Sequence, residues 1–345
     1  MNSARILTIP RPFQRVPRRG KEAERGVALL VVIMVVLMVS FLASELIMQV
    51  RAELRIAANG KERAVSAFLA EAGVNACLFW LMGDKPLATE TGKDEPFLAG
   101  HLYEAELPTG TVQYQAVGES GKIDLNTTPI ELLKLFLKHE GLDEKQIDIL
   151  TDSLQDWRDA DDLVRMNGAE SEYYQKLDDP YVARNGPIED PSEIMLVRGA
   201  DALRGRVVPE DVFTVHNPGG KIDFNSLTPA MLDFLVDGDQ DREKAYREAQ
   251  ELYGTLNQAN AMEILGDRFA IFANYLSFGS AQNSFLQGMR GESYYSIEAT
   301  GFAGAKEEKG EEGEEARKRP GIRTRTLVKV TGNTVQYLSW KEESI

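Results

Sequence analysis

The sequence has little of what enzymes and disulfide-stabilised domains depend on. Its 345 residues include one cysteine and three histidines, and the histidines lie far apart in the chain. No internal disulfide can form, and no histidine cluster with metal-site spacing is present. CxxC, HExxH, GxSxG and a Walker-type glycine loop are also absent, so no nucleophile–base pair or nucleotide-binding loop is visible. We therefore expect a protein that is not an enzyme, with Cys77 buried and unreactive among apolar neighbours.

Positive charge is scarce outside the first residues. The chain carries a net charge of −15, although residues 1–26 hold seven Lys and Arg against two Glu. The remainder therefore carries −20, and a field of that sign repels the phosphates of nucleic acids. The hydrophobic content of 43% is enough for a buried core, and the length leaves room for two domains.

Charge is absent altogether from residues 27–44. At about 1.5 Å of helix rise per residue, this apolar run can cross most or all of the hydrocarbon core of a bilayer. The basic residues in front of it predict that the N-terminal end stays in the cytoplasm. The sequence thus predicts a single-pass membrane protein whose C-terminal part is exported.

The helical pattern continues beyond the apolar run, because Leu46, Val50 and Leu54 recur at steps of four residues. A cleaved signal peptide would instead end at a small-residue cleavage site, whereas Ala43-Ser44 leads on without a turn. We expect one helix over residues 27–82, with residues 27–44 in the membrane and the second half packed on a soluble domain. A plain single-pass anchor fits these features as well.

The junction of Arg25-Gly26 with Val27 resembles the signal of type IV prepilins. In that family a prepilin peptidase cuts after the glycine and methylates the new N-terminus, which implies a leader of residues 1–26 and processing between Gly26 and Val27. Most pilins carry Glu at the fifth mature position, where this chain has Val31. The lack of that Glu resembles the minor pseudopilin K family of type II secretion systems.

One phrase occurs twice in the chain. Gly121-Lys122-Ile123-Asp124-Leu125-Asn126 returns as Gly220-Lys221-Ile222-Asp223-Phe224-Asn225, and a Thr-Pro pair and an apolar stretch follow each copy. In the first copy we expect Thr128 to cap a helix, with Pro129 at its first position and Glu131 completing a capping box. A duplicated structural unit without a ligand explains most of this repeat.

The same phrase also occurs in helix-hairpin-helix DNA-binding proteins, including membrane-anchored DNA-uptake receptors. Those proteins need a glycine-bearing hairpin whose backbone amides contact phosphate. The nearest candidate, residues 196–200, lacks the second glycine. A membrane-anchored DNA-binding module is therefore the alternative reading, and the acidic charge argues against it.

The segment between the two copies resembles the pseudopilin K family most specifically. Its phrases are Asp156-Trp157-Arg158-Asp159-Ala160-Asp161-Asp162, Asn167-Gly168-Ala169-Glu170, Tyr173-Tyr174, Asn185-Gly186-Pro187 and residues 193–199. Residues 163–166 are more apolar than expected of the family's loop. The resemblance implies a non-enzymatic subunit at the tip of a periplasmic pseudopilus, anchored in the bacterial inner membrane. Its partners would be minor pseudopilins I and J and the major pseudopilin, and its role would be protein export across the outer membrane.

Acidic residues in this segment are the one place where metal chemistry is plausible. Asp159 and Asp161 occupy alternate positions next to Asp162, and Glu170 follows eleven residues after Asp159. Calcium takes six to eight oxygen ligands, several of them carboxylates, from a loop that can wrap around it. The spacing is not that of an EF-hand, because Val164 stands where its glycine should be. The family's inserted domain is associated with calcium, which favours a calcium site over a solvated acidic loop.

Alternating residues predict strands at 101–106, 111–117, 294–299, 324–331 and 334–340, and helical patterns predict helices at 144–157 and 192–197. We expect an α+β fold in which the long N-terminal helix packs on a pilin-like antiparallel sheet. The sheet would be formed by residues 83–119 and 286–345. An inserted α-helical domain with the two repeats would occupy residues 120–285, and a charged loop would span residues 306–319.

Overall fold

The computed structural model describes residues 21–82, 100–278, 292–304, 320–331 and 334–345. The first twenty residues of the expected leader and the expected charged loop at 306–319 lie outside these ranges. The chain divides into two compact units, residues 1–61 and 62–345.

The first element is a single long helix, α1 (Lys21–Leu81), which continues through Gly60 and Gly73. It begins before the expected start at Val27, so Gly26 and Val27 both lie inside the helix. Within the described residues one stretch, Ala28–Leu81, is long and apolar enough to cross a membrane. The long apolar helix expected from the sequence is confirmed.

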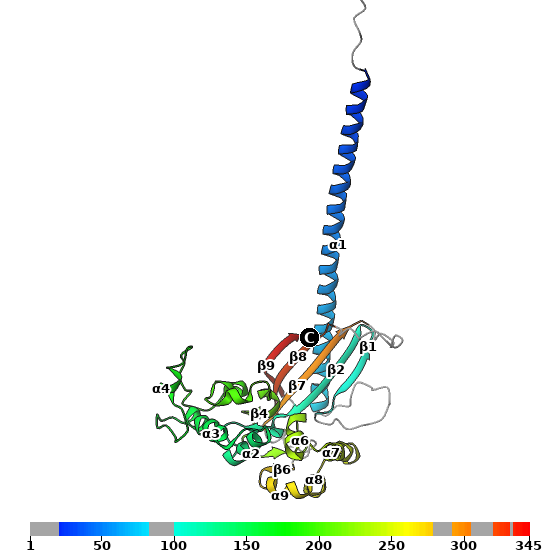
Figure 1. Ribbon diagram of the computed structural model, residues 1–345. Helices are drawn as coiled ribbons and strands as arrows, with labels where there is room; N and C mark the ends of the chain where they lie inside the picture. The colour runs from blue at the N-terminus through cyan, green and yellow to red at the C-terminus, as the bar shows by residue number, and fades with distance from the viewer. Residues whose placement is uncertain (1–20, 83–99, 279–291, 305–319, 332–333) are drawn as a thin grey trace, which may run out of the picture. The chain divides into compact units, whose positions relative to one another are not determined.

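The second unit contains a five-stranded antiparallel sheet, which confirms the α+β class (Figure 1). Its order is β1 (Tyr103–Leu107), β2 (Gly110–Gly118), β7 (Glu292–Ala303), β8 (Ile322–Thr331) and β9 (Thr334–Ser344). The alternating sequence pattern matches the burial most clearly in β8, where every second residue is buried. Strand β2 is buried along most of its length, and β9 is mostly exposed.

The last part of α1, residues 65–81, packs directly on this sheet, in a core that includes Val74, Cys77 and Val328. The expected burial of Cys77 is confirmed. Glycines allow the close approach of helix and sheet: a Cβ at Gly301 would lie 2.1 Å from the carbonyl oxygen of Ser66.

Between β2 and β7 the chain forms a mainly helical region, as expected for the insertion (Figure 1). Its helices are α2 (Ile130–His139), α3 (Glu144–Arg158), α4 (Ser171–Tyr174), α5 (Pro209–Val212), α6 (Pro229–Val236), α7 (Gln240–Tyr253), α8 (Gln258–Leu265) and α9 (Phe269–Phe272). Short 3₁₀ helices lie at η1 (Glu119–Gly121), η2 (Pro191–Leu196), η3 (Ala200–Leu203) and η4 (Gly266–Arg268). The stretch expected to be helical at 192–197 is thus a 3₁₀ helix, which begins at Pro191 with the Asp190 carboxylate accepting a bond from the Ser192 amide.

The two copies of the repeat have equivalent structures. Each begins with a two-residue strand, β3 (Ile123–Asp124) or β5 (Ile222–Asp223), which pairs in parallel with β4 (Phe213–Thr214) or β6 (Leu276–Ser277). In the first copy the side chain of Asn126 donates to the carbonyl of Ile188 and accepts from its amide, at 2.9 Å each. In the second copy Asn225 makes the same pair of bonds to Leu256, at 2.9 and 2.7 Å. The repeated asparagine therefore ties each copy to a distant segment, which supports a structural role.

The predicted cap of α2 is wrong. The residue that caps α2 is Pro129, with no side-chain bond, because the hydroxyl of Thr128 instead accepts a hydrogen bond from the Asp124 amide at 2.9 Å. In the second copy the equivalent Thr228 does cap α6, accepting from the Met231 amide at 3.1 Å.

A buried polar network joins the helical region to the sheet. Lys122 and Glu119 are both 3% exposed, and Lys122 Nζ lies 2.5 Å from Glu119 Oε1. The same carboxylate accepts hydrogen bonds from the hydroxyls of Ser296 on β7 and Thr214 on β4. In the second copy the equivalent residue, Lys221, is exposed. Lys122 therefore takes part in the contact between the helical region and the sheet, whereas the equivalent Lys221 is exposed.

Candidate functional site

Three of the four predicted metal ligands meet in space. One carboxylate oxygen from each of Asp159, Asp161 and Glu170 lies within 4.8 Å of the others. Asp159 follows the last residue of α3 and Glu170 precedes the first residue of α4, so the ends of two helices bring them together. The fourth predicted ligand, Asp162, is exposed beside this group and accepts a bond from Asn185 Nδ2 at 3.4 Å.

Several oxygen atoms in this cluster are buried and have no hydrogen-bond donor among the described residues. They are both carboxylate oxygens of Glu170, Asp159 Oδ1 and Asn185 Oδ1. A buried polar atom without a partner is destabilising by roughly 1–3 kcal/mol, and more when it is charged. A cation held by Asp159 and Glu170 would satisfy the three carboxylate oxygens among them.

The electrostatics of Glu170 lead to the same conclusion. The side chain is 3% exposed, and burial, followed by the neighbouring charges of Asp156 and Asp159, raises its pKa to about 7. One cation already lies close, because Arg165 Nη1 is 2.5 Å from oxygens of both Asp156 and Asp159. Its single positive charge offsets only one of these two carboxylates, and among the described residues no ion pair reaches Glu170.

The donor set fits calcium, because it consists of carboxylate and amide oxygens only. Asn185 was not among the predicted ligands. Its backbone φ is 50°, a left-handed conformation that asparagine adopts more readily than most residues. The pair Asn185-Gly186 signals a turn, and only the fold shows that this turn lies against the cluster, where the Asn185 amide donates to the Trp157 carbonyl at 2.9 Å and Nδ2 to Asp162 at 3.4 Å.

Aromatic residues pack together at α3 and α4, the two helices whose ends carry Asp159 and Glu170. The ring of Trp157 packs edge-on against Tyr174 with centroids 5.0 Å apart, and Tyr174 stacks on Tyr181. The indole nitrogen donates to Glu193 at 3.1 Å. Trp157 is 3% exposed, which makes it a spectroscopic reporter two residues from Asp159.

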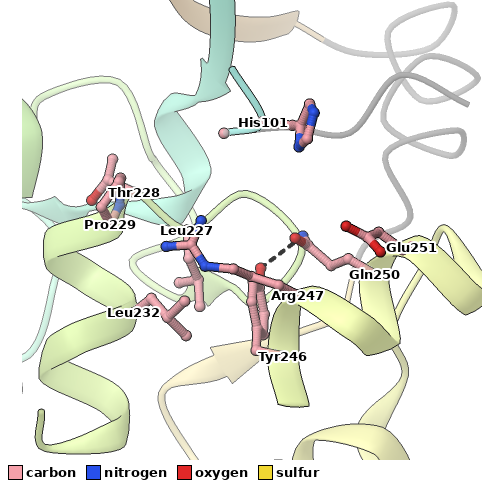
Figure 2. Close-up of a pocket in the computed structure, with 10 residues that line it drawn as sticks. His101, Leu227, Thr228, Pro229, Leu232, Tyr246, Arg247, Gln250 and Glu251 are labelled. Carbon is pink, nitrogen blue, oxygen red and sulfur yellow. Dashed lines mark hydrogen bonds between the residues drawn. The ribbon is translucent and has the colours of Figure 1, made fainter. Parts of the chain in front are cut away.

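A second concave site lies between the start of the sheet and helices α6 and α7 (Figure 2). Its volume is about 170 Å³, and Gly100, His101, Leu227, Thr228, Pro229, Leu232, Tyr246, Arg247, Gln250 and Glu251 line it. Figure 2 shows Gln250 bonded to the hydroxyl of Tyr246, at 2.9 Å, and that hydroxyl donates to the Phe224 carbonyl at 2.7 Å. Small-molecule sites enclose about 300–1,000 Å³, so this pocket is too small for a cofactor.

The three histidines do not meet. His101 lies at the pocket, the ring nitrogens of His139 each lie 3.1 Å from Asp233 or Asp237, and His216 stacks on Tyr294 at 4.7 Å. Each has a local partner or an exposed position, and the sequence likewise shows no histidine cluster.

Comparison with known proteins identifies the family to which the chain is similar. Residues 115–207, which include the acidic cluster, match the family model described as type II secretion system (T2SS), protein K. Over 233 residues the chain is 27% identical to type II secretion system protein K of Aeromonas hydrophila, covering 61% of this chain and 70% of that protein. The resemblance to protein K of type II secretion is confirmed.

Two other proteins K match shorter stretches. That of Pectobacterium carotovorum subsp. carotovorum is 30% identical over 115 residues, 33% of this chain and 35% of that protein. That of Klebsiella pneumoniae is 32% identical over 102 residues, 29% of this chain and 31% of that protein. A chain from the crystal structure of the GspK-GspI-GspJ complex of enterotoxigenic Escherichia coli covers 86% of this chain and 99% of its own length, at 15% identity and a TM-score of 0.49.

Proposed function

We propose that this chain is a structural subunit of a type II secretion system, a minor pseudopilin that works by assembly and not by catalysis. The match of residues 115–207 to protein K carries the proposal. The architecture supports it, because a long apolar helix is followed by an antiparallel sheet with a helical insertion. Helix α1 would anchor the chain in the inner membrane, with the second unit in the periplasm.

The partners follow from the same proposal. The chain would join minor pseudopilins I and J and the major pseudopilin at the tip of the pseudopilus and assist the export of proteins across the outer membrane. A charged group is expensive in lipid unless it is paired. In pilins the Glu at the fifth mature position is thought to pair with the N-terminus of the subunit ahead, and Val31 cannot do so. A subunit that does not need to pair with a subunit ahead of it is suited to be the first one in the pseudopilus, at its tip.

Co-purification and labelling test this assignment. The full chain, solubilised in detergent with minor pseudopilins I and J of the same secretion system, should purify as a stable complex, and immunogold should label one end of each pseudopilus. Labelling along the whole filament would contradict the tip position. Failure to bind either pseudopilin, together with retardation of DNA at low salt, would favour the DNA-uptake alternative.

Processing gives an independent prediction. Prepilin peptidase should cut between Gly26 and Val27 and methylate the new N-terminus, leaving the apolar part of α1 attached. N-terminal sequencing and mass spectrometry of the mature chain check this result, and Gly26→Leu should leave the leader in place. A mature chain that starts at Met1, or beyond Ala43, would exclude the prepilin pathway.

We also propose that Asp159, Asp161, Glu170 and Asn185 hold a calcium ion that stabilises the helical region. The ion would supply positive charge to the buried carboxylate oxygens described above. Asp162 lies next to this set and would contribute charge.

A further inference from the structure

The loop from Leu163 to Met166 is here called the apolar loop. Its three hydrophobic side chains, Leu163, Val164 and Met166, are exposed to solvent. Met166 is 96% exposed, Leu163 76% and Val164 61%. Among the large hydrophobic side chains that the structure describes, Met166 and Leu163 are the two most exposed. Exposed apolar residues that lie singly are ordinary, but a contiguous group marks a binding surface.

The polar groups of the apolar loop hold this surface in place. Arg165 lies between Val164 and Met166 in the chain. Its backbone amide and its guanidinium both donate hydrogen bonds to the Asp156 carboxylate. At one end the Leu163 amide donates to Asp161 Oδ1 at 2.9 Å, and just beyond the other end Asn167 donates twice to Asp152 at 3.1 Å. The aliphatic side chains are therefore displayed by a pre-ordered backbone, which reduces the entropy lost on binding.

The charge around the apolar loop defines the partner. From Asp156 to Glu193 the chain has eleven acidic and four basic side chains. Asp161 and Asp162, directly before Leu163, are exposed. Complementary surfaces place basic residues opposite such a rim, whereas an anionic lipid surface would be repelled.

We propose that the apolar loop is a docking site that inserts Leu163, Val164 and Met166 into an apolar hollow, rimmed by Lys and Arg, on a partner protein. Burial of these three side chains removes apolar surface from water, which favours binding. The proposal goes beyond pseudopilin assembly and rests on the loop geometry, whether or not the acidic cluster holds a cation.

Site-specific photocrosslinking tests the proposal in cells that make the full chain with its own secretion system. p-Benzoylphenylalanine replaces Met166, and the same probe at Leu252, 73% exposed on α7, is the matched control. The Met166 probe should form a protein adduct that the Leu252 probe does not form. The crosslinked residue should line an apolar hollow flanked by basic residues.

Binding measurements then test the energetics with the purified partner and full chain. Leu163→Ser with Val164→Ser should weaken binding by at least about tenfold, and added salt should weaken binding of the parent chain further. Leu252→Ser should leave the affinity unchanged, and equal melting temperatures would show that all variants fold. Adducts with lipid only, no adduct above the Leu252 control, a partner surface without basic residues, or unchanged affinity of the double variant would each overturn the proposal.

Discussion

Chelation of calcium should lower the melting temperature of the protein, and Glu170→Gln should abolish that response. A ligand that binds only the native state stabilises it by RT ln(1 + [L]/Kd), about 2.7 kcal/mol at a hundredfold excess over Kd. Glu170 is the residue to change because both its oxygens are buried without a donor. Thermal unfolding of the full chain with calcium and with excess chelator measures the difference.

The control for this experiment is Glu172→Gln. Glu172 lies on α4 two residues from Glu170, but it is exposed and pairs with Lys176, so this variant should keep the full response to chelator. Terbium, which takes the same oxygen ligands as calcium, should give luminescence sensitised by Trp157 in the parent chain and not in Glu170→Gln. A parent melting curve that chelator leaves unchanged would favour the acidic loop without a metal.

The same experiment has a pH dependence with a defined sign. The pKa of Glu170 in the metal-free protein is raised from 4.5 to about 7, so between these values the folded state binds more protons than the unfolded state. The contribution of this group to stability is therefore greatest below pH 4.5 and is lost as the pH rises to 7. Calcium should oppose this loss, and Glu170→Gln should remove it.

Lys122→Met should destabilise the second unit by about 3–5 kcal/mol, because it leaves the carboxylate of Glu119 buried without its cation. The melting temperature should fall by on the order of 10 °C. Adding Glu119→Gln to Lys122→Met should recover part of the loss, since the buried charge is then gone. Calorimetry of the full chain measures these changes.

The repeat supplies a matched control at the equivalent position. Lys221→Met changes the same residue of the second copy, which is exposed, and should alter stability by no more than about 0.5 kcal/mol. Equal effects of the two substitutions would show that Lys122 and Glu119 do not form the connection between helical region and sheet.

The comparison of the two repeats also shows how far the sequence could predict the fold. The strands of the sheet follow from local alternation, and the carboxylates of the acidic cluster from their spacing. The capping rule succeeds at Thr228 and fails at Thr128, because the Thr128 hydroxyl accepts a bond from Asp124. The partners of Asn126 and Asn225, and the contact of Asn185 with Asp162 beside the cluster, depend on segments distant in the chain. No local pattern contains that information.

The pairing of β2 with β7 has a mechanical consequence. Gly118, where the chain leaves the sheet, lies opposite Tyr295, close to where it returns, so the helical region is joined to the sheet at two neighbouring points on adjacent strands. A force that separates these two points sideways would open the β2–β7 hydrogen bonds one after another from this end. A force along the strands would move β2 and β7 in the same direction, so the load would pass to many bonds at once in their pairings with β1 and β8. The helical region should therefore be held far more firmly against forces along the strands than against forces that spread them.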